Sequence, residues 1–186
     1  QHVVDDAAEI YVTPTGSQKY KARIVGEDRK LDIAVLKIDG GPFPHARLGR
    51  SDDVIIGEWV IALGNPFGLF DISSTPTVTV GVVSAKDQDF GRQGGGRVYE
   101  DMLQTDAAIN SGNSGGPLVN CTGDVIGINT WILSGSHYSG TNIGIGFAIP
   151  INRVKTILDD LIHYGRVDRS FWTGITCADL QPSVAR

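Results

Sequence analysis

The chain has 186 residues, of which 41% are hydrophobic and 20% are charged, and its formal net charge is −5. This composition is typical of a globular protein with a substantial core. Acidic and basic residues are interspersed, which argues against nucleic-acid binding and against a polybasic membrane surface. The apolar runs are much shorter than the ~20 residues of a membrane-spanning helix. No Cys/His cluster has zinc spacing, so we expect no metal and no cofactor.

Short β-branched runs between glycine-rich turns dominate the chain. Several alternate apolar and polar residues with a period of two, as in YKARIV (20–25) and IAVLKI (33–38). We expect strands within residues 9–15, 19–28, 32–39, 58–64, 77–87, 124–133 and 143–150. Short strands with regular turns and no βαβ rhythm predict an all-β fold of antiparallel barrels.

One late segment, residues 150–165, has helical periodicity. Four apolar positions predict its buried face: Ile151, Val154, Leu158 and Leu161. Asn152 is the expected cap at its start, and Gly165 follows the last turn, where a left-handed residue is favoured.

Residues 112–116, GNSGG, place Ser114 between an asparagine and two glycines. A serine hydroxyl is a poor nucleophile at neutral pH and needs a base, a group that orients the base, and donors for an oxyanion. The flanking glycines permit a backbone in which the amides of Gly112 and Ser114 converge. The alternative is a tight turn without chemistry.

Four histidines are candidates for the base. His163 falls in the last helical turn, which favours a structural role, and His45 and His137 lie in segments expected to face solvent. His2 lies at the edge of the first strand. Asp32, directly before an apolar run, is the candidate that orients the base, and its alternative role is a local turn hydrogen bond.

The chain order His2, Asp32, Ser114 is that of the chymotrypsin-type triad. Six stretches resemble the HtrA/Deg family of serine proteases: HVVDDAAEIYV (2–12), DRKLDIAVLKID (28–39), LGRSDDVIIGEWVIALGNPFGL (48–69), TVTVGVVSA (77–85), LQTDAAINSGNSGGPLVNCTGDVIGINT (103–130) and GIGFAIP (144–150). The resemblance runs from His2 to about Arg169. It implies a chymotrypsin-like double β-barrel with one late α-helix.

The resemblance also implies roles for individual residues. Ser114 would attack the scissile carbonyl, His2 would accept its proton, and Asp32 would hold the imidazole in one tautomer. The segment Gly112, Asn113 and Ser114 would form the oxyanion hole, with the amides of Gly112 and Ser114 as donors.

The family's specificity pocket corresponds to Ile109, Ile132 and Ile145. Such a lining predicts a preference for medium apolar side chains, such as Val, because a charged group would be desolvated there without a partner. The stretch of Thr130, Trp131 and Ile132 would pair with the substrate backbone. Core packing is the alternative for the three isoleucines.

Trypsin-like enzymes carry an aspartate before the nucleophile, and it pairs with a newly cut N-terminal ammonium. Asn113 is uncharged, so we expect no activation by zymogen cleavage. The resemblance implies reversible ordering of two segments instead, residues 109–114 and 133–142. The second is rich in glycine and serine, as a mobile loop should be.

The sequence departs from the family at its start. Family members carry a hairpin before the histidine, and His2 is the second residue here. We therefore expect the first barrel to lack its opening strands and the chain to be a portion of a longer protein. Gln1 replaces the usual asparagine, and Ser111 an often-found proline. The stretch DQDFGRQGGGRV (87–98) lacks a phosphate-binding pattern and predicts a flexible surface loop.

Residues 1–165 would then form the protease domain, and residues 166–186 a linker with the truncated start of a PDZ domain. Within this tail, WTGI (172–175) resembles that domain's carboxylate-binding loop.

These features predict a serine endopeptidase that degrades unfolded or damaged proteins in protein quality control. A non-catalytic peptide-binding or chaperone-like module using the same cleft is the alternative. The resemblance implies unfolded polypeptides as partners, no nucleic acid, no membrane insertion, and a homotrimer or larger assembly of the full-length protein. It places the protein in the bacterial periplasm or cell envelope, or in an organelle of endosymbiotic origin.

Overall fold

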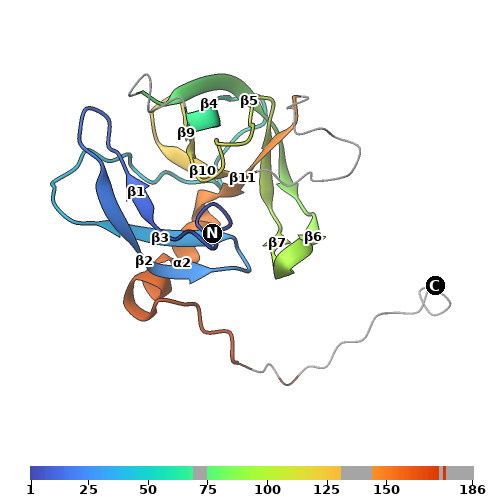
Figure 1. The fold of residues 1–186 in the computed structure, drawn as a ribbon. Helices are drawn as coiled ribbons and strands as arrows, with labels where there is room; N and C mark the ends of the chain where they lie inside the picture. Colours follow the sequence, from blue (N-terminus) through green and yellow to red (C-terminus); the bar gives the residue numbers. More distant parts are fainter. Residues whose placement is uncertain (69–74, 131–143, 172–173, 175–186) are drawn as a thin grey trace.

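The protein is described by a computed structural model that covers residues 1–68, 75–130, 144–171 and 174 (Figure 1). Its N-terminal part is an antiparallel sheet of three strands in chain order: β1 (Ile10–Val12), β2 (Tyr20–Asp28) and β3 (Ile33–Ile38). The sheet lies below the barrel in Figure 1, and the N-terminus lies between the two. Within the described residues, no helix has the length and apolar character needed to cross a membrane.

The second part is a closed antiparallel barrel with the strand order β10-β11-β8-β5-β4-β9. Its strands are β4 (Trp59–Gly64), β5 (Thr77–Gln88), β8 (Met102–Thr105), β9 (Pro117–Asn120), β10 (Val125–Thr130) and β11 (Gly146–Pro150). Inward-facing apolar side chains pack together in one cluster, which includes Val60, Ala62, Val83, Leu118 and Ile126. The prediction of an all-β, chymotrypsin-like fold with an open N-terminal part is confirmed. The short strands β8 and β9 were missing from the sequence prediction.

The glycine-rich stretch 87–98 differs from the predicted flexible surface loop. Together with Tyr99 it forms a small hairpin of β6 (Gly91–Arg92) and β7 (Val98–Tyr99), joined by the 3₁₀ turn η2 (Gly94–Gly96). The tip is exposed, but the amide of Val98 donates a 2.8 Å hydrogen bond to the Lys30 carbonyl in the turn before β3. The hairpin is therefore attached to the N-terminal sheet. A second 3₁₀ turn, η1 (Pro66–Gly68), follows β4.

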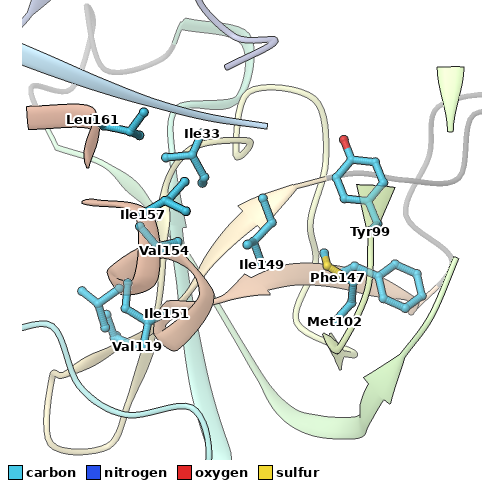
Figure 2. Close-up of a cluster of buried hydrophobic side chains, with 11 residues drawn as sticks. Ile33, Tyr99, Met102, Val119, Phe147, Ile149, Ile151, Val154, Ile157 and Leu161 are labelled. Carbon is cyan, nitrogen blue, oxygen red and sulfur yellow. The ribbon is translucent and has the colours of Figure 1, made fainter. Parts of the chain in front are cut away.

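The helix α2 (Ile151–Tyr164) follows β11 directly and contacts both β parts, touching β2, β3, β10 and β11. Its buried face is Ile151, Val154, Ile157 and Leu161. Figure 2 shows these side chains packed beside Ile33 of β3 and Ile149 of β11. Leu158 is half-buried and lines one cavity with Ile151 and Val154, as expected for residues on one face. The fully buried Ile157 was not predicted. The helix thus joins the sheet to the barrel through one apolar core.

The two ends of α2 are capped by different means. Gly165 has φ 73° and donates its amide to the Leu161 carbonyl at 3.2 Å, which confirms the predicted C-cap. The predicted N-cap was wrong, because Asn152 lies inside the helix. Its amide donates instead to the Ser51 hydroxyl at 3.1 Å, and its side-chain oxygen accepts the Ser51 amide at 3.3 Å. A distant loop supplies the capping oxygen.

The segment after α2 is anchored to β2. Arg169 donates two hydrogen bonds of 2.7 Å to the carboxylate of Asp28, whose side chain is 7% exposed. The amide of Glu27 donates to the Gly165 carbonyl at 3.2 Å. Burial alone would raise the pKa of Asp28, but the Arg169 guanidinium and the Leu31 amide outweigh burial and lower it.

Replacing this carboxylate should destabilise the fold in a pH-dependent way. We expect Asp28→Asn to lower the free energy of unfolding at pH 7 by about 1–3 kcal/mol, since a charge-assisted bidentate contact is lost. Folding lowers the Asp28 pKa, so this stabilisation is present above the unfolded value of about 3.9 and is lost as the pH falls below it. Urea unfolding of wild type and variant at pH 7 and pH 3 measures the loss of stability and its pH dependence. A penalty of equal size at the two pH values, or one matched by the exposed control Asp159→Asn, would contradict the assignment.

Candidate active site

Asp32 lies in the turn between β2 and β3, in a backbone conformation that few residues tolerate. Its φ is +59°, in the left-handed region that Asp and Asn enter more readily than bulkier residues do. The Asp32 amide donates to the Arg29 carbonyl at 3.3 Å, which closes the turn. The residue is only 4% exposed. The turn therefore places a carboxylate in the interior, where it needs donors.

His2 supplies two of these donors. Its ring Nδ1 lies 2.5 Å from Asp32 Oδ2, and its backbone amide donates to Oδ1 at 2.8 Å. Burial alone would raise the pKa of the Asp32 carboxyl, but the hydrogen bonds from the His2 ring and amide and from Tyr99 hold it well below its usual range. Because Asp32 is ionised, Nδ1 carries a proton and donates it, which leaves Nε2 as the basic nitrogen of the neutral ring.

Ser114 lies in a tightly packed loop after β8. Gly112 has φ 97°, and a Cβ there would lie 2.6 Å from Pro66 Cα, so a larger residue would be strained and would clash. A Cβ on Gly116 would lie 2.1 Å from the Leu63 carbonyl oxygen. The amide of Gly115 donates to the Asn129 carbonyl at 2.8 Å. The glycines of the GNSGG motif therefore allow the loop to press against β4 and β10.

The structure brings His2, Asp32 and Ser114 to one cavity of about 480 Å³. They line it together with apolar side chains from the sheet, the barrel and α2, among them Ile33, Val35, Ile128, Ile149 and Val154. No hydrogen bond joins the His2 ring to Ser114 in the described structure. Catalytic hydrogen bonds are often long before a substrate is bound, so this geometry suits a resting site.

The amides expected to bind an oxyanion are available. In the described parts of the chain, the amides of Gly112 and Ser114 donate to no backbone carbonyl, whereas their neighbours Asn113 and Gly115 do. Gly112 and Ser114 also share the lining of a second, shallower hollow beside η1. Backbone donors of this kind beside Ser114 are what oxyanion stabilisation would require.

The predicted specificity pocket is only partly within the described residues. Ile109 is 2% exposed and packs in the barrel core. Ile145 is half-buried against the apolar cluster that includes Phe147 and Ile149. Thr130 ends β10 and lines the cavity beside Ser114. Trp131 and Ile132 lie outside the described residues, as do residues 133–142. The pocket therefore stays a prediction.

The remaining histidines lie away from this cavity where the structure describes them. His45 is exposed, with Nδ1 3.3 Å from the Phe43 carbonyl oxygen. His163 lies in the last turn of α2, and its ring contacts the Asp159 carbonyl at 2.8 Å. His137 lies outside the described residues.

Comparison with known proteins places the chain and its fold in one family. Residues 1–128 match the family described as "Trypsin-like peptidase domain". The chain is 52% identical over 185 residues to the "Probable periplasmic serine endoprotease DegP-like" of Chlamydia trachomatis serovar D, covering 99% of this chain and 35% of that protein. A relative of the same description from Pseudomonas savastanoi is 44% identical, with 99% and 36% covered. The structure "HtrA-type protease AlgW with decapeptide" matches with a TM-score of 0.84 and 43% identity, over 99% of this chain and 53% of that one.

The chain belongs to the HtrA/Deg family of trypsin-like serine proteases. It spans about a third of the length of the curated relatives it matches. The family membership predicted from the sequence is thus confirmed.

Two residues at this HtrA/Deg site were missed by the sequence analysis. The Tyr99 hydroxyl donates to Asp32 Oδ2 at 2.8 Å, and Arg97 Nε lies 3.4 Å from Asp32 Oδ1. Arg97 lies in the glycine-rich stretch 87–98, which showed no periodicity, and Tyr99 follows it directly. The sequence carried no signal for them beyond the presence of polar residues after three glycines.

Asn113, directly before Ser114, is 2% exposed. Its side-chain nitrogen donates to the Ala108 carbonyl at 3.0 Å, and its side-chain oxygen is buried without a hydrogen bond. Within the described residues, its contacts include no cationic side chain. The position therefore holds a neutral amide and offers nothing to stabilise an aspartate.

An aspartate at this position should destabilise the protein strongly. We expect Asn113→Asp to lower the free energy of unfolding at pH 7 by about 3–5 kcal/mol, because a buried charge is left unpaired and faces the Ala108 carbonyl. Burial raises the pKa of such a carboxyl, so the penalty is present at neutral pH and shrinks as acid protonates it. Urea unfolding at pH 7 and pH 4 tests this, with the exposed Ser111→Asp as control. Equal, small losses for both variants would show that the position tolerates charge.

Proposed function

We propose that this chain is the catalytic part of a serine endopeptidase, with Ser114 as nucleophile, His2 as general base and Asp32 as the group that orients the base. One observation carries the proposal. The Asp32 carboxylate is bonded to the His2 ring at 2.5 Å, and both line a cavity with Ser114 in a chain of the HtrA/Deg family.

The chemistry follows from the positions of the protons. Asp32 accepts the Nδ1 proton of His2, so Nε2 is free to take the hydroxyl proton as Ser114 Oγ forms a bond to the scissile carbonyl carbon. The carbonyl electron pair moves to the oxygen, and the amides of Gly112 and Ser114 stabilise that oxyanion. The tetrahedral intermediate collapses, the imidazolium protonates the leaving amine, and an acyl-enzyme remains. Water, deprotonated by His2, then releases the new carboxyl end.

We propose extended polypeptide segments of unfolded or damaged proteins as the substrates. Related structures were determined with a decapeptide and with a tripeptide. The apolar wall of the cavity favours apolar side chains that become accessible when a substrate unfolds. The curated relatives are named periplasmic, which supports a bacterial periplasmic location for this protein. The homotrimer or larger assembly expected for the full-length protein remains part of the proposal.

The same proposal divides the chain into a protease domain, residues 1–165, and a linker with the start of a PDZ domain, residues 166–186. The Asp28–Arg169 ion pair attaches the first residues of this linker to β2 of the protease domain. Residues 172–173 and 175–186, which include most of the WTGI stretch, lie outside the described residues.

Labelling by a fluorophosphonate tests the proposed function. The full-length protein should be labelled and should cleave an unfolded protein substrate, and Ser114→Ala should lose both. We expect Ser114→Ala and His2→Ala to lower kcat by about 10⁶-fold and Asp32→Asn by about 10⁴-fold. Asp32→Asn can keep the left-handed turn, so circular dichroism should show an unchanged fold. An unlabelled but peptide-binding wild-type protein would instead be the non-catalytic, chaperone-like module.

We propose that activity is switched without cleavage of the chain, because Asn113 carries no charge to pair with a new N-terminus. A peptide ligand should raise the turnover of the uncleaved protein several-fold while its mass, measured by mass spectrometry, stays unchanged. Activity that appears only after N-terminal processing would rule out this mode of regulation.

A further inference from the structure

The buried carboxylate of Asp32 is held from two sides of the molecule. His2, on the N-terminal side, bonds to both oxygens. From the other side, the β6–β7 hairpin contributes Tyr99, which donates to Oδ2 at 2.8 Å, and Arg97, whose Nε lies 3.4 Å from Oδ1. Each carboxylate oxygen therefore receives one contact from His2 and one from the hairpin.

The Tyr99 ring is fixed by core packing. Tyr99 is 6% exposed and belongs to the same apolar cluster as Met102 and Phe147. In Figure 2 its hydroxyl points away from both of these side chains. The ring of Phe90, next to β6, packs edge-on against Phe147 with centroids 4.7 Å apart, and the Phe90 amide donates to the Tyr99 carbonyl at 2.8 Å. The hydroxyl is thus held in place by the barrel core.

We propose that Tyr99 is a positioning residue for the catalytic aspartate, with Arg97 as a weaker second contact. Without the Tyr99 hydroxyl, the imidazole would be the one hydrogen-bond partner left to Oδ2 among the described residues. The carboxylate could then rotate away from the geometry that holds the His2 ring. The inference rests on the proposed function, because orientation of Asp32 matters for turnover only if His2 acts as the base.

The two contacts differ in strength. Burial and the Asp32 carboxylate raise the pKa of Tyr99 well above its ordinary value, so the phenol stays protonated and donates at every pH of interest. The Arg97 side chain is 21% exposed, and its terminal nitrogen also lies 3.8 Å from the Asp5 carboxylate. Its attraction for Asp32 is therefore shared and partly screened by solvent.

Gln1 is a further polar residue next to Asp32. The backbone nitrogen of Gln1 donates to the Asp32 carbonyl at 2.7 Å, and the Gln1 side chain lies 3.5 Å from Glu27 and from Arg97. The positively charged groups near the carboxylate are the Gln1 ammonium, 3.3 Å from Oδ1, Arg97, and His2 when protonated. Tyr99 is the neutral donor whose removal leaves the formal charge of the site unchanged.

The decisive experiment compares Tyr99→Phe with wild type in the full-length protein. The ring stays in place, so the protein should stay folded, with a moderately lower thermal midpoint because the buried carboxylate loses a donor. Tyr164→Phe, with a residue that is 77% exposed, is the matched control. We expect kcat for a peptide substrate to fall about ten-fold with KM unchanged, which lies at the low end for one charge-assisted hydrogen bond. Arg97→Gln should lower kcat less, and its effect should weaken as salt is added.

A second readout does not depend on proteolysis. The Asp32 carboxyl carbon can be followed by NMR as the pH is lowered, in the inactive Ser114→Ala background. Tyr99→Phe removes a donor that favours the carboxylate, so the midpoint should rise by about one pH unit, and Tyr164→Phe should leave it unchanged.

These readouts separate the two hypotheses. An Asp32 midpoint unaffected by Tyr99→Phe would overturn the inference, and so would a raised midpoint with an unchanged kcat. A wild-type protein that neither hydrolyses peptides nor reacts with the fluorophosphonate would overturn the proposed function. The Asp32 titration would then still show whether the Tyr99 hydroxyl stabilises the carboxylate.

Discussion

A buried negative charge is the constraint on which the site depends. A carboxylate that is 4% exposed costs several kcal/mol to remove from water unless hydrogen-bond donors surround it. The donors around Asp32 come from the N-terminal segment, through His2, and from the β6–β7 hairpin, through Tyr99 and Arg97. The contacts that offset this cost also hold the imidazole in a single orientation. Stability and preorganisation therefore rest on the same few hydrogen bonds.

Ser114, the proposed nucleophile, is positioned by a steric constraint instead. Gly112 and Gly116 leave no room for a Cβ against Pro66 and Leu63, so the loop lies directly on the barrel wall. The hydrogen bond from the Gly115 amide to the Asn129 carbonyl then fixes the position of this loop along β10. Ser114 is positioned by the barrel, and Asp32 with His2 by the sheet. The distance between His2 and Ser114 is consequently set by how the sheet and the barrel pack, and α2 joins these two parts through its apolar face.

Local sequence patterns were sufficient to predict many of the strands and the residues of the candidate site. The alternation in residues 20–25 and 33–38 predicted the sheet, and the chain order of His2, Asp32 and Ser114 predicted the residues that now line one cavity. The failures have a common physical origin. Asn152 is a good capping residue, but the helix is capped by Ser51, which is 101 residues away in the chain. Strand β9 has only four residues, too few for a period to emerge. Contacts between residues far apart in the chain produce no pattern in a short stretch of sequence.

Tyr99, at the candidate site, is another residue whose contact could not be predicted from the local sequence. It lies 67 residues from Asp32 in the chain and follows a run of glycines that suggests a loop. Its chemistry becomes visible only when the barrel core fixes its ring and the β2–β3 turn brings the carboxylate to its hydroxyl. Because β6 and β7 have two residues each, the hairpin gains little stability from its own pairing. Its position depends instead on the Phe90–Phe147 contact, on the Val98–Lys30 hydrogen bond and on Asp32 itself. The aspartate and the hairpin thus stabilise each other, and the orientation of the base is linked to the packing of the barrel.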